Sequence, residues 1–142
     1  MRLLFAITII CFSPTSIIAQ DNVDLNEMVG FACYFEGSPT KTVIKVEKLL
    51  KSRNYKALSK LMMSGHNGER FLAIISLQRL TTLGRYDLSL TESDLIEKAK
   101  QSDEMVSVCS GCTYFAKVPM KAILANDDFI WSGYWLERLI VE

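Results

Sequence analysis

Apolar residues recur every three or four positions along most of this chain, the spacing that places side chains on one face of an α-helix. A helix is predicted over about 24–35, with a face formed by Leu25, Met28, Val29, Ala32 and Phe35. Further helices are predicted over about 69–83 and about 92–101. Because 71–77 is apolar on nearly every side, we expect that helix to lie at the centre of the fold.

Residues that favour helix ends support this division. Ser38-Pro39 predicts the start of a second helix, and Asn54 predicts the cap of a third that carries Tyr55, Leu58, Leu61 and Met62. Gly84 predicts a stop for the fourth helix. Thr91-Glu92-Ser93-Asp94 resembles a capping box for the helix over about 92–101.

The pattern is less regular after residue 103. Met105 to Val108 fits either a last helical turn or a short extended piece, and Pro119 either starts or kinks a helix that reaches Leu124. Asn126-Asp127 predicts the cap of a final helix that carries Trp131 and Trp135. We therefore expect an all-α domain of about five to seven helices, arranged as a compact bundle or a short α-solenoid.

Residues 40–84 combine Leu49-Leu50, Ala57-Leu58 and Arg70-Phe71-Leu72-Ala73 with Leu77 and Leu80. This stretch resembles a HEAT or armadillo-type repeat, in which helix pairs of about 40 residues bury one another's faces. The resemblance covers about a third of the chain. It implies a scaffold that binds other proteins and has no catalytic residues.

The first residues have the order of a secretory signal. Positively charged Arg2 is followed by an apolar run from Leu3 to Phe12 and by small residues up to Ala19. We expect cleavage after Ala19, so that 1–19 is a signal peptide, 20–142 is a single domain, and the protein is periplasmic or secreted. Lipid attachment at Cys11 is the less favoured alternative. No later segment approaches membrane-spanning length.

Three cysteines remain after this cleavage, Cys33, Cys109 and Cys112, and an exported protein is expected to form a disulfide. Four interpretations stay open: a local Cys109–Cys112 bridge, a bridge from Cys33 to one of that pair, a redox-active Cys-x-x-Cys, or a metal site. A redox role gains support if the motif starts a helix, whose dipole lowers a thiol pKa. A zinc site would use Cys33, His66, Cys109 and Cys112.

Charge and aromatic residues suggest surfaces for a partner. Residues 41–60 contain seven basic residues and one acidic one, and Lys41, Lys45 and Lys48 lie off the apolar stripe. With the signal removed, 15 basic residues face 16 acidic ones, which argues against general binding to nucleic acid. On a helix, Trp131 and Trp135 share a face and could anchor a partner.

The sequence contains few residues suited to catalysis. His66 is the single histidine, and neither a Gly-x-Ser-x-Gly elbow nor a phosphate-binding glycine loop accompanies it. We therefore predict a non-catalytic protein-interaction module that needs no cofactor, with an unidentified protein as its partner. The alternatives are a thiol–disulfide protein that uses Cys109 and Cys112, and a metal-stabilised domain.

Overall fold

The computed structural model describes residues 22–126 and 128–140. The signal predicted for 1–19, lipid attachment at Cys11 and the cap predicted at Asp127 lie outside these residues. Within them, no helix has the length and apolar character needed to cross a membrane. The disulfide bond between Cys33 and Cys109 agrees with an exported protein.

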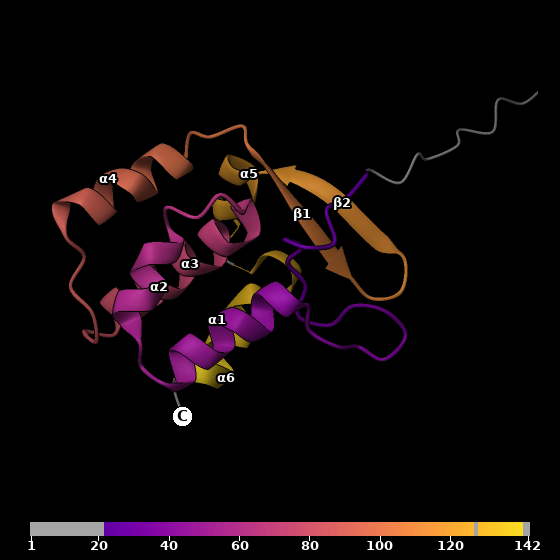
Figure 1. Cartoon of the computed structure of the whole chain (residues 1–142), viewed down its shortest axis with the longest axis horizontal. Coiled ribbons are helices and arrows are strands. Elements are labelled where there is room, and N and C mark those ends of the chain that lie inside the picture. The colour runs from indigo at the N-terminus through magenta and orange to yellow at the C-terminus, as the bar shows by residue number, and fades with distance from the viewer. Residues whose placement is uncertain (1–21, 127, 141–142) are drawn as a thin grey trace, which may run out of the picture.

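The elements follow one another in the order α1 Lys41–Lys51, α2 Tyr55–Leu61, α3 Asn67–Thr82, α4 Leu90–Ala99, β1 Met105–Ser110, β2 Tyr114–Pro119, α5 Met120–Leu124, the 3-10 turn η1 Phe129–Trp131, and α6 Ser132–Ile140 (Figure 1). Helix α3 is central, as predicted, because it contacts α1, α2, α5, α6 and β1. Its buried side chains include Phe71, Leu72, Ile74, Leu77 and Leu80. Helices α1, α2 and α3, which span most of 40–84, pack on one another.

The all-α prediction is wrong, because β1 and β2 form an antiparallel two-stranded sheet and the fold is mixed α/β. The register runs from Met105 opposite Pro119 to Ser110 opposite Tyr114. Residues 106–109 are all buried, on both faces of β1. A short strand that is covered on both sides lacks the alternating pattern of a half-exposed strand, so periodicity could not separate it from a helical turn.

The helix predicted over about 24–35 is also wrong. This segment is irregular and lies alongside β1, where Val29 and Val108 form a parallel bridge. The Val29 N–H donates to the Ser107 carbonyl at 2.8 Å, and the Cys109 N–H donates to the Val29 carbonyl at 2.9 Å. Met28 and Val29 are buried here, whereas Leu25 and Phe35 are exposed. Backbone pairing with a strand distant in sequence therefore replaced a local helix.

Two of the predicted helix ends are confirmed, and two are displaced by a few residues. The Asn54 side chain accepts from the Ala57 N–H at 3.1 Å, and Gly84 ends α3 with a left-handed φ of 66°. Helix α1 begins at Lys41 with Thr40 as its cap, slightly later than Ser38-Pro39 predicts. The capping box of α4 is formed by Ser89 and Glu92, so the helix starts before the predicted one.

Near the C-terminus, β2 ends at Pro119 and α5 runs to Leu124, which confirms a helix start at this proline. The final helix is α6, and it begins only at Ser132. Before it, Ile130 and Trp131 have left-handed φ values of 48° and 73°. This break turns Trp131 away from the register of α6, so Trp131 and Trp135 do not share a helix face.

Candidate functional site

Residues 33–38, which we call the aromatic loop, project from the molecule beside the β1–β2 hairpin (Figure 1). Two hydrogen bonds close its base: the Cys33 N–H donates to the Ser38 carbonyl at 2.9 Å, and the Ser38 N–H donates to the Cys33 carbonyl at 3.0 Å. Gly37 has a φ of 62°, a conformation that glycine adopts without strain. At the tip, the Phe35 side chain is 94% exposed.

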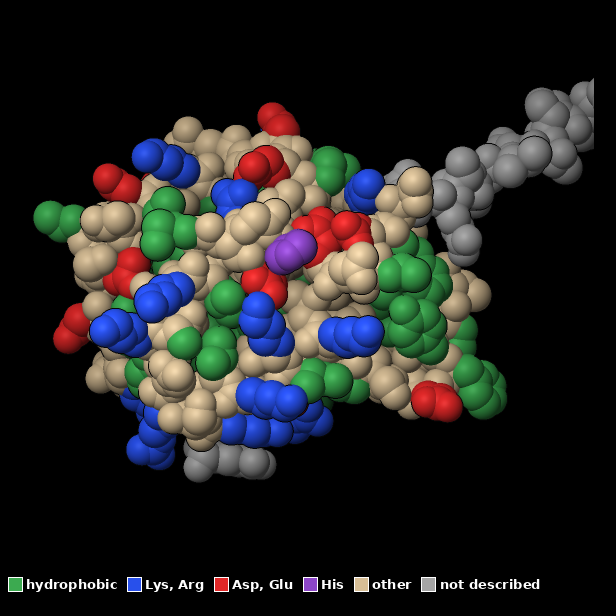
Figure 2. Space-filling view, in the orientation of Figure 1, with side chains coloured by type: hydrophobic (Ala, Val, Ile, Leu, Met, Phe, Trp, Pro, Cys, Tyr) green, Lys and Arg blue, Asp and Glu red, His purple; other side chains and the backbone are tan. Residues whose placement is uncertain are grey.

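Two exposed tyrosines lie on the aromatic loop and on the hairpin beside it. Tyr34 is 48% exposed, and its ring centroid lies 5.9 Å from that of Phe115. Tyr114, at the start of β2, is also exposed. Figure 2 shows hydrophobic side chains gathered at this end of the molecule. The exposed set, which we call the aromatic patch, consists of Tyr34, Phe35 and Tyr114.

The Cys33–Cys109 disulfide attaches the aromatic loop to β1, with a Cα–Cα distance of 5.8 Å. Both cysteines are fully buried. Next to the bond, the Tyr34 N–H donates to the Gly111 carbonyl at 3.0 Å, and a Cβ at Gly30 would overlap both sulfur atoms. The loop is therefore fixed at its base by a covalent bond and by the backbone, whereas its tip is in solvent.

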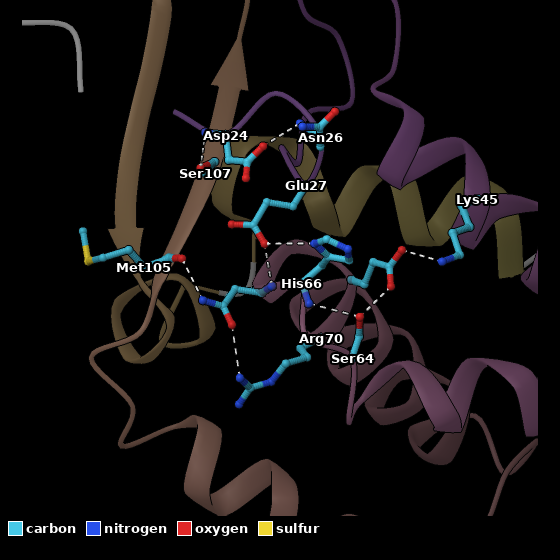
Figure 3. Close-up of polar contacts among 11 residues, drawn as sticks. Asp24, Asn26, Glu27, Lys45, Ser64, His66, Arg70, Met105 and Ser107 are labelled. Atoms are coloured by element: carbon cyan, nitrogen blue, oxygen red, sulfur yellow. Dashed lines mark hydrogen bonds and ion pairs between the residues drawn. The ribbon is translucent and has the colours of Figure 1, made fainter. Parts of the chain in front are cut away.

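A polar cluster at the start of α3 holds the N-terminal segment that precedes the aromatic loop in sequence (Figure 3). The Glu27 carboxylate accepts from the Asn67 N–H at 2.9 Å, and the His66 Nδ1 lies 3.7 Å from it. A Cβ at Gly68 would overlap the Glu27 carbonyl oxygen, so the segment packs directly on the backbone of α3. On the other side, the Asp24 N–H donates to the Ser107 Oγ at 2.9 Å.

The second carboxylate of this cluster belongs to Glu69, which is mostly buried. Lys45 Nζ lies 2.5 Å from its Oε1, and the Ser64 hydroxyl donates to its Oε2 at 2.7 Å. Burial raises the pKa of Glu69, but the hydrogen bonds and the charge of Lys45 outweigh that effect and lower it overall. The carboxylate is thus ionised at neutral pH and holds α1 against α3.

This cluster does not form a catalytic constellation. The Ser64 hydroxyl is directed at Glu69 and accepts from the backbone N–H of His66, while the imidazole faces Glu27. A serine nucleophile needs a base within hydrogen-bond reach of its hydroxyl, and here a carboxylate with a lowered pKa occupies that place. The arrangement instead joins the N-terminal segment, α1 and α3.

The structure selects one of the four interpretations of the cysteines, the bridge from Cys33 to one of the later pair. Cys112 is a free, exposed thiol in the turn between β1 and β2, so Cys109 and Cys112 are not bonded to each other. Because the motif lies in a hairpin turn and not at a helix start, a helix dipole does not activate it. Among the described residues, His66 and the cysteines do not converge, and no metal-binding group is present there.

Only some of the partner-binding residues predicted from sequence are exposed and without an ion pair in the described part of the chain. Trp135 is buried, packs against Phe31 in a tilted arrangement with ring centroids 4.9 Å apart, and donates to Glu47. Trp131 is 64% exposed. Lys45 is paired with Glu69, whereas Lys41 and Lys48 are exposed and form no ion pair within the described residues.

The sequence interpretation missed the aromatic patch, because the helix predicted over about 24–35 placed Phe35 on a buried face. One signal could have located it. The stretch from Tyr34 to Pro39 combines Gly37, Ser38 and Pro39, and such residues mark turns.

Comparison with family models, with curated proteins and with solved structures finds no match to this chain. The function is therefore argued from its own residues.

Proposed function

We propose that this chain is a non-catalytic exported protein-interaction module that binds its partner through the aromatic patch. The observation that carries the proposal is Phe35, whose side chain is 94% exposed at the tip of a loop fixed by a disulfide. Single exposed apolar residues are common in folded proteins, but a group of aromatic side chains on one projection marks an interaction site.

The way in which the loop is held favours binding. Ordering a flexible loop on association costs free energy, and a loop already fixed in one conformation avoids much of that cost. Here the base is closed by the Cys33–Ser38 hydrogen bonds and by the bond to Cys109. Aromatic side chains add a large contact area with few rotatable bonds, and they dominate the energetics of protein interfaces.

The test compares capture of partners by matched variants. Wild-type protein, Phe35→Ala and Leu90→Ala are immobilised and exposed to the exported fraction of the source cells, and the retained proteins are quantified by mass spectrometry. Leu90 is 89% exposed at the start of α4, away from the aromatic loop (Figure 1), so it controls for loss of any exposed apolar side chain.

We expect a protein that wild type and Leu90→Ala retain equally and that Phe35→Ala loses. Both variants should unfold at the wild-type temperature, because neither side chain is packed in the core. Retention of the same proteins by all three, or by none, would contradict the proposal.

A thiol–disulfide role is a second candidate, favoured by the exposed thiol of Cys112 three positions after Cys109. In that reaction the Cys112 thiolate attacks the Cys109 sulfur, the Cys109–Cys112 bond forms, and Cys33 leaves as a thiolate. Peptide mapping after incubation in a glutathione buffer and rapid alkylation tests it. A substantial fraction of Cys109–Cys112 peptide is expected; Cys33–Cys109 as the sole bridge at every buffer ratio would exclude the role.

A further inference from the structure

A second surface, which we call the basic surface, lies beside the aromatic loop. It is formed by exposed cationic side chains of α1, of α2 and of the link between them, namely Lys41, Lys48, Arg53, Lys56 and Lys60. None of these forms an ion pair within the described part of the chain. Figure 2 shows basic side chains across the same face that carries the aromatic end of the molecule.

Two of the acidic side chains close to the basic surface, Glu47 and Glu69, are already occupied. Glu47, the acidic residue in α1, accepts from the Trp135 Nε1 and lies 3.5 Å from the Lys51 Nζ and 3.6 Å from Arg138. Glu69 is held by Lys45 and Ser64. Both carboxylates are largely buried and held by these partners, so neither forms an ion pair with a cation of the basic surface.

The acidic stretch that follows α3 does not balance this surface either. It is partly neutralised in place, because Glu97 pairs with Lys100, Asp103 with Lys121, and Glu104 with Arg70. A chain with 16 basic and 16 acidic residues, and a formal charge of zero, thus keeps a group of exposed basic side chains on α1, on α2 and on their link that form no ion pair within the described residues. An anionic partner would complement these cations.

We infer that the partner bound by the aromatic patch is a protein segment with several carboxylates flanking an apolar anchor site. This inference rests on the proposed function. Only two residues join the end of the aromatic loop at Ser38 to the start of α1 at Lys41, so a partner bound at the loop lies next to the first turn of α1. Aromatic anchors at the centre with charged residues at the rim are the usual composition of a protein interface.

A general polyanion fits less well. Binding to nucleic acid or to an anionic membrane draws on an excess of positive charge, and this chain has none overall. Heparin also offers no apolar site for a fixed phenyl ring at the loop tip. Binding of heparin, or of vesicles that contain phosphatidylglycerol, is therefore an outcome that would count against the inference.

The first experiment uses three short synthetic peptides of equal length, which alternate glutamate with leucine, glutamate with serine, and lysine with leucine. Each is titrated into isotope-labelled protein, and backbone amide shifts are followed by NMR. The glutamate–leucine peptide should move amides of both the aromatic loop and the basic surface, and the glutamate–serine peptide only those of the basic surface. Equal shifts with the lysine–leucine peptide, or no shifts with either glutamate peptide, would overturn the inference.

The second experiment uses charge reversal with a matched control. Lys41→Glu/Lys48→Glu changes two exposed lysines of the basic surface, and Lys98→Glu/Lys100→Glu changes two exposed lysines near the end of α4 by the same net charge. The first variant should bind the glutamate–leucine peptide about tenfold more weakly, and the control should stay close to wild type. Added salt should reduce wild-type affinity more than that of the first variant.

The experiments distinguish failure of the proposed function from failure of the inference about an acidic partner. If Phe35→Ala abolishes partner capture while Lys41→Glu/Lys48→Glu retains the same protein at the same salt sensitivity, the interaction module stands and the acidic partner is excluded. If the charge-reversed variant loses binding to heparin or to phosphatidylglycerol vesicles and Phe35→Ala does not, the basic surface binds polyanions and the acidic protein partner is excluded.

Discussion

The Trp135 Nε1 donates a hydrogen bond of 2.9 Å to the Glu47 carboxylate, which joins α6 to α1 across 88 positions of sequence. Trp135 is otherwise enclosed by apolar side chains, with its ring 4.9 Å from that of Phe31. The polar end of the indole is therefore satisfied at the edge of the core, and the last helix is held in place by both packing and a charge-assisted hydrogen bond.

We expect Trp135→Phe to lower the free energy of unfolding by about 1–3 kcal/mol, because it removes this hydrogen bond and part of the buried volume. Trp131→Phe is the matched control, since Trp131 is 64% exposed and its loss should change stability by less than about 0.5 kcal/mol. Urea denaturation of the two variants measures the difference. Equal midpoints would contradict the role given to Trp135.

Close packing of the N-terminal segment predicts a strong effect of a single methyl group at Gly68. Its Cβ would overlap the Glu27 carbonyl oxygen, so Gly68→Ala should push the segment off α3 and cost about 1–3 kcal/mol. At Gly65, in the preceding turn, nothing lies within 4 Å of an added Cβ. Gly65→Ala should leave the thermal midpoint unchanged, and a similar loss in both variants would show that the packing at Gly68 is not responsible.

The disulfide closes a loop with a sequence separation of 76 residues. In the chain-entropy view, a bridge of that span stabilises the folded state by about 4 kcal/mol relative to the reduced chain. Cys33→Ala/Cys109→Ala should therefore unfold at much lower denaturant concentration, whereas Cys112→Ser should match wild type. A stability loss in Cys112→Ser comparable to that of the double variant would mean that the exposed thiol has a structural role.

The carboxylate of Glu92 predicts how stability falls in acid. Burial raises its pKa, but hydrogen bonds from Ser59, Tyr86 and Ser89 outweigh the effect and lower the pKa to about 2. Since the folded pKa lies below the unfolded one, the carboxylate stabilises the fold above about pH 4.5, and this contribution is lost as pH falls toward 2.

The loss should be on the order of 2–3 kcal/mol between pH 6 and pH 2. Glu92→Gln should be less stable than wild type at neutral pH and should show a flatter dependence on acid, in urea titrations at a series of pH values. A wild-type slope that persists in Glu92→Gln would assign the acid sensitivity to other carboxylates, such as Glu69.

Sequence patterns located the helices that depend on local signals. Asn54 caps a helix through its own side chain, Gly84 ends one through its backbone freedom, and the buried stripe of α3 is continuous in sequence. Each of these signals acts within a few residues. The patterns failed where partners are distant: Val29 pairs with Val108, and nothing near Val29 in sequence indicates that strand.

The candidate site was predicted only in part. Cys33 and Cys109 were recognised as possible partners, yet spacing could not choose between Cys109 and Cys112, because only the fold decides which sulfur meets Cys33. Lys41 and Lys48 could be predicted as exposed from their place off the apolar stripe of α1. The apolar periodicity placed Phe35 on a buried face, and only the turn residues that follow it, Gly37 to Pro39, indicated a loop.

The two cysteines whose disulfide holds the aromatic loop are incorporated at different stages of protein synthesis. A ribosome adds Cys33 before any of the helices, and it adds Cys109 76 residues later, after α1 to α4 are complete. The bond can close only then. Until Cys109 has been added, the nascent polypeptide thus lacks the disulfide that shapes its proposed recognition surface, and a partner meets the finished loop only after the two thiols are oxidised.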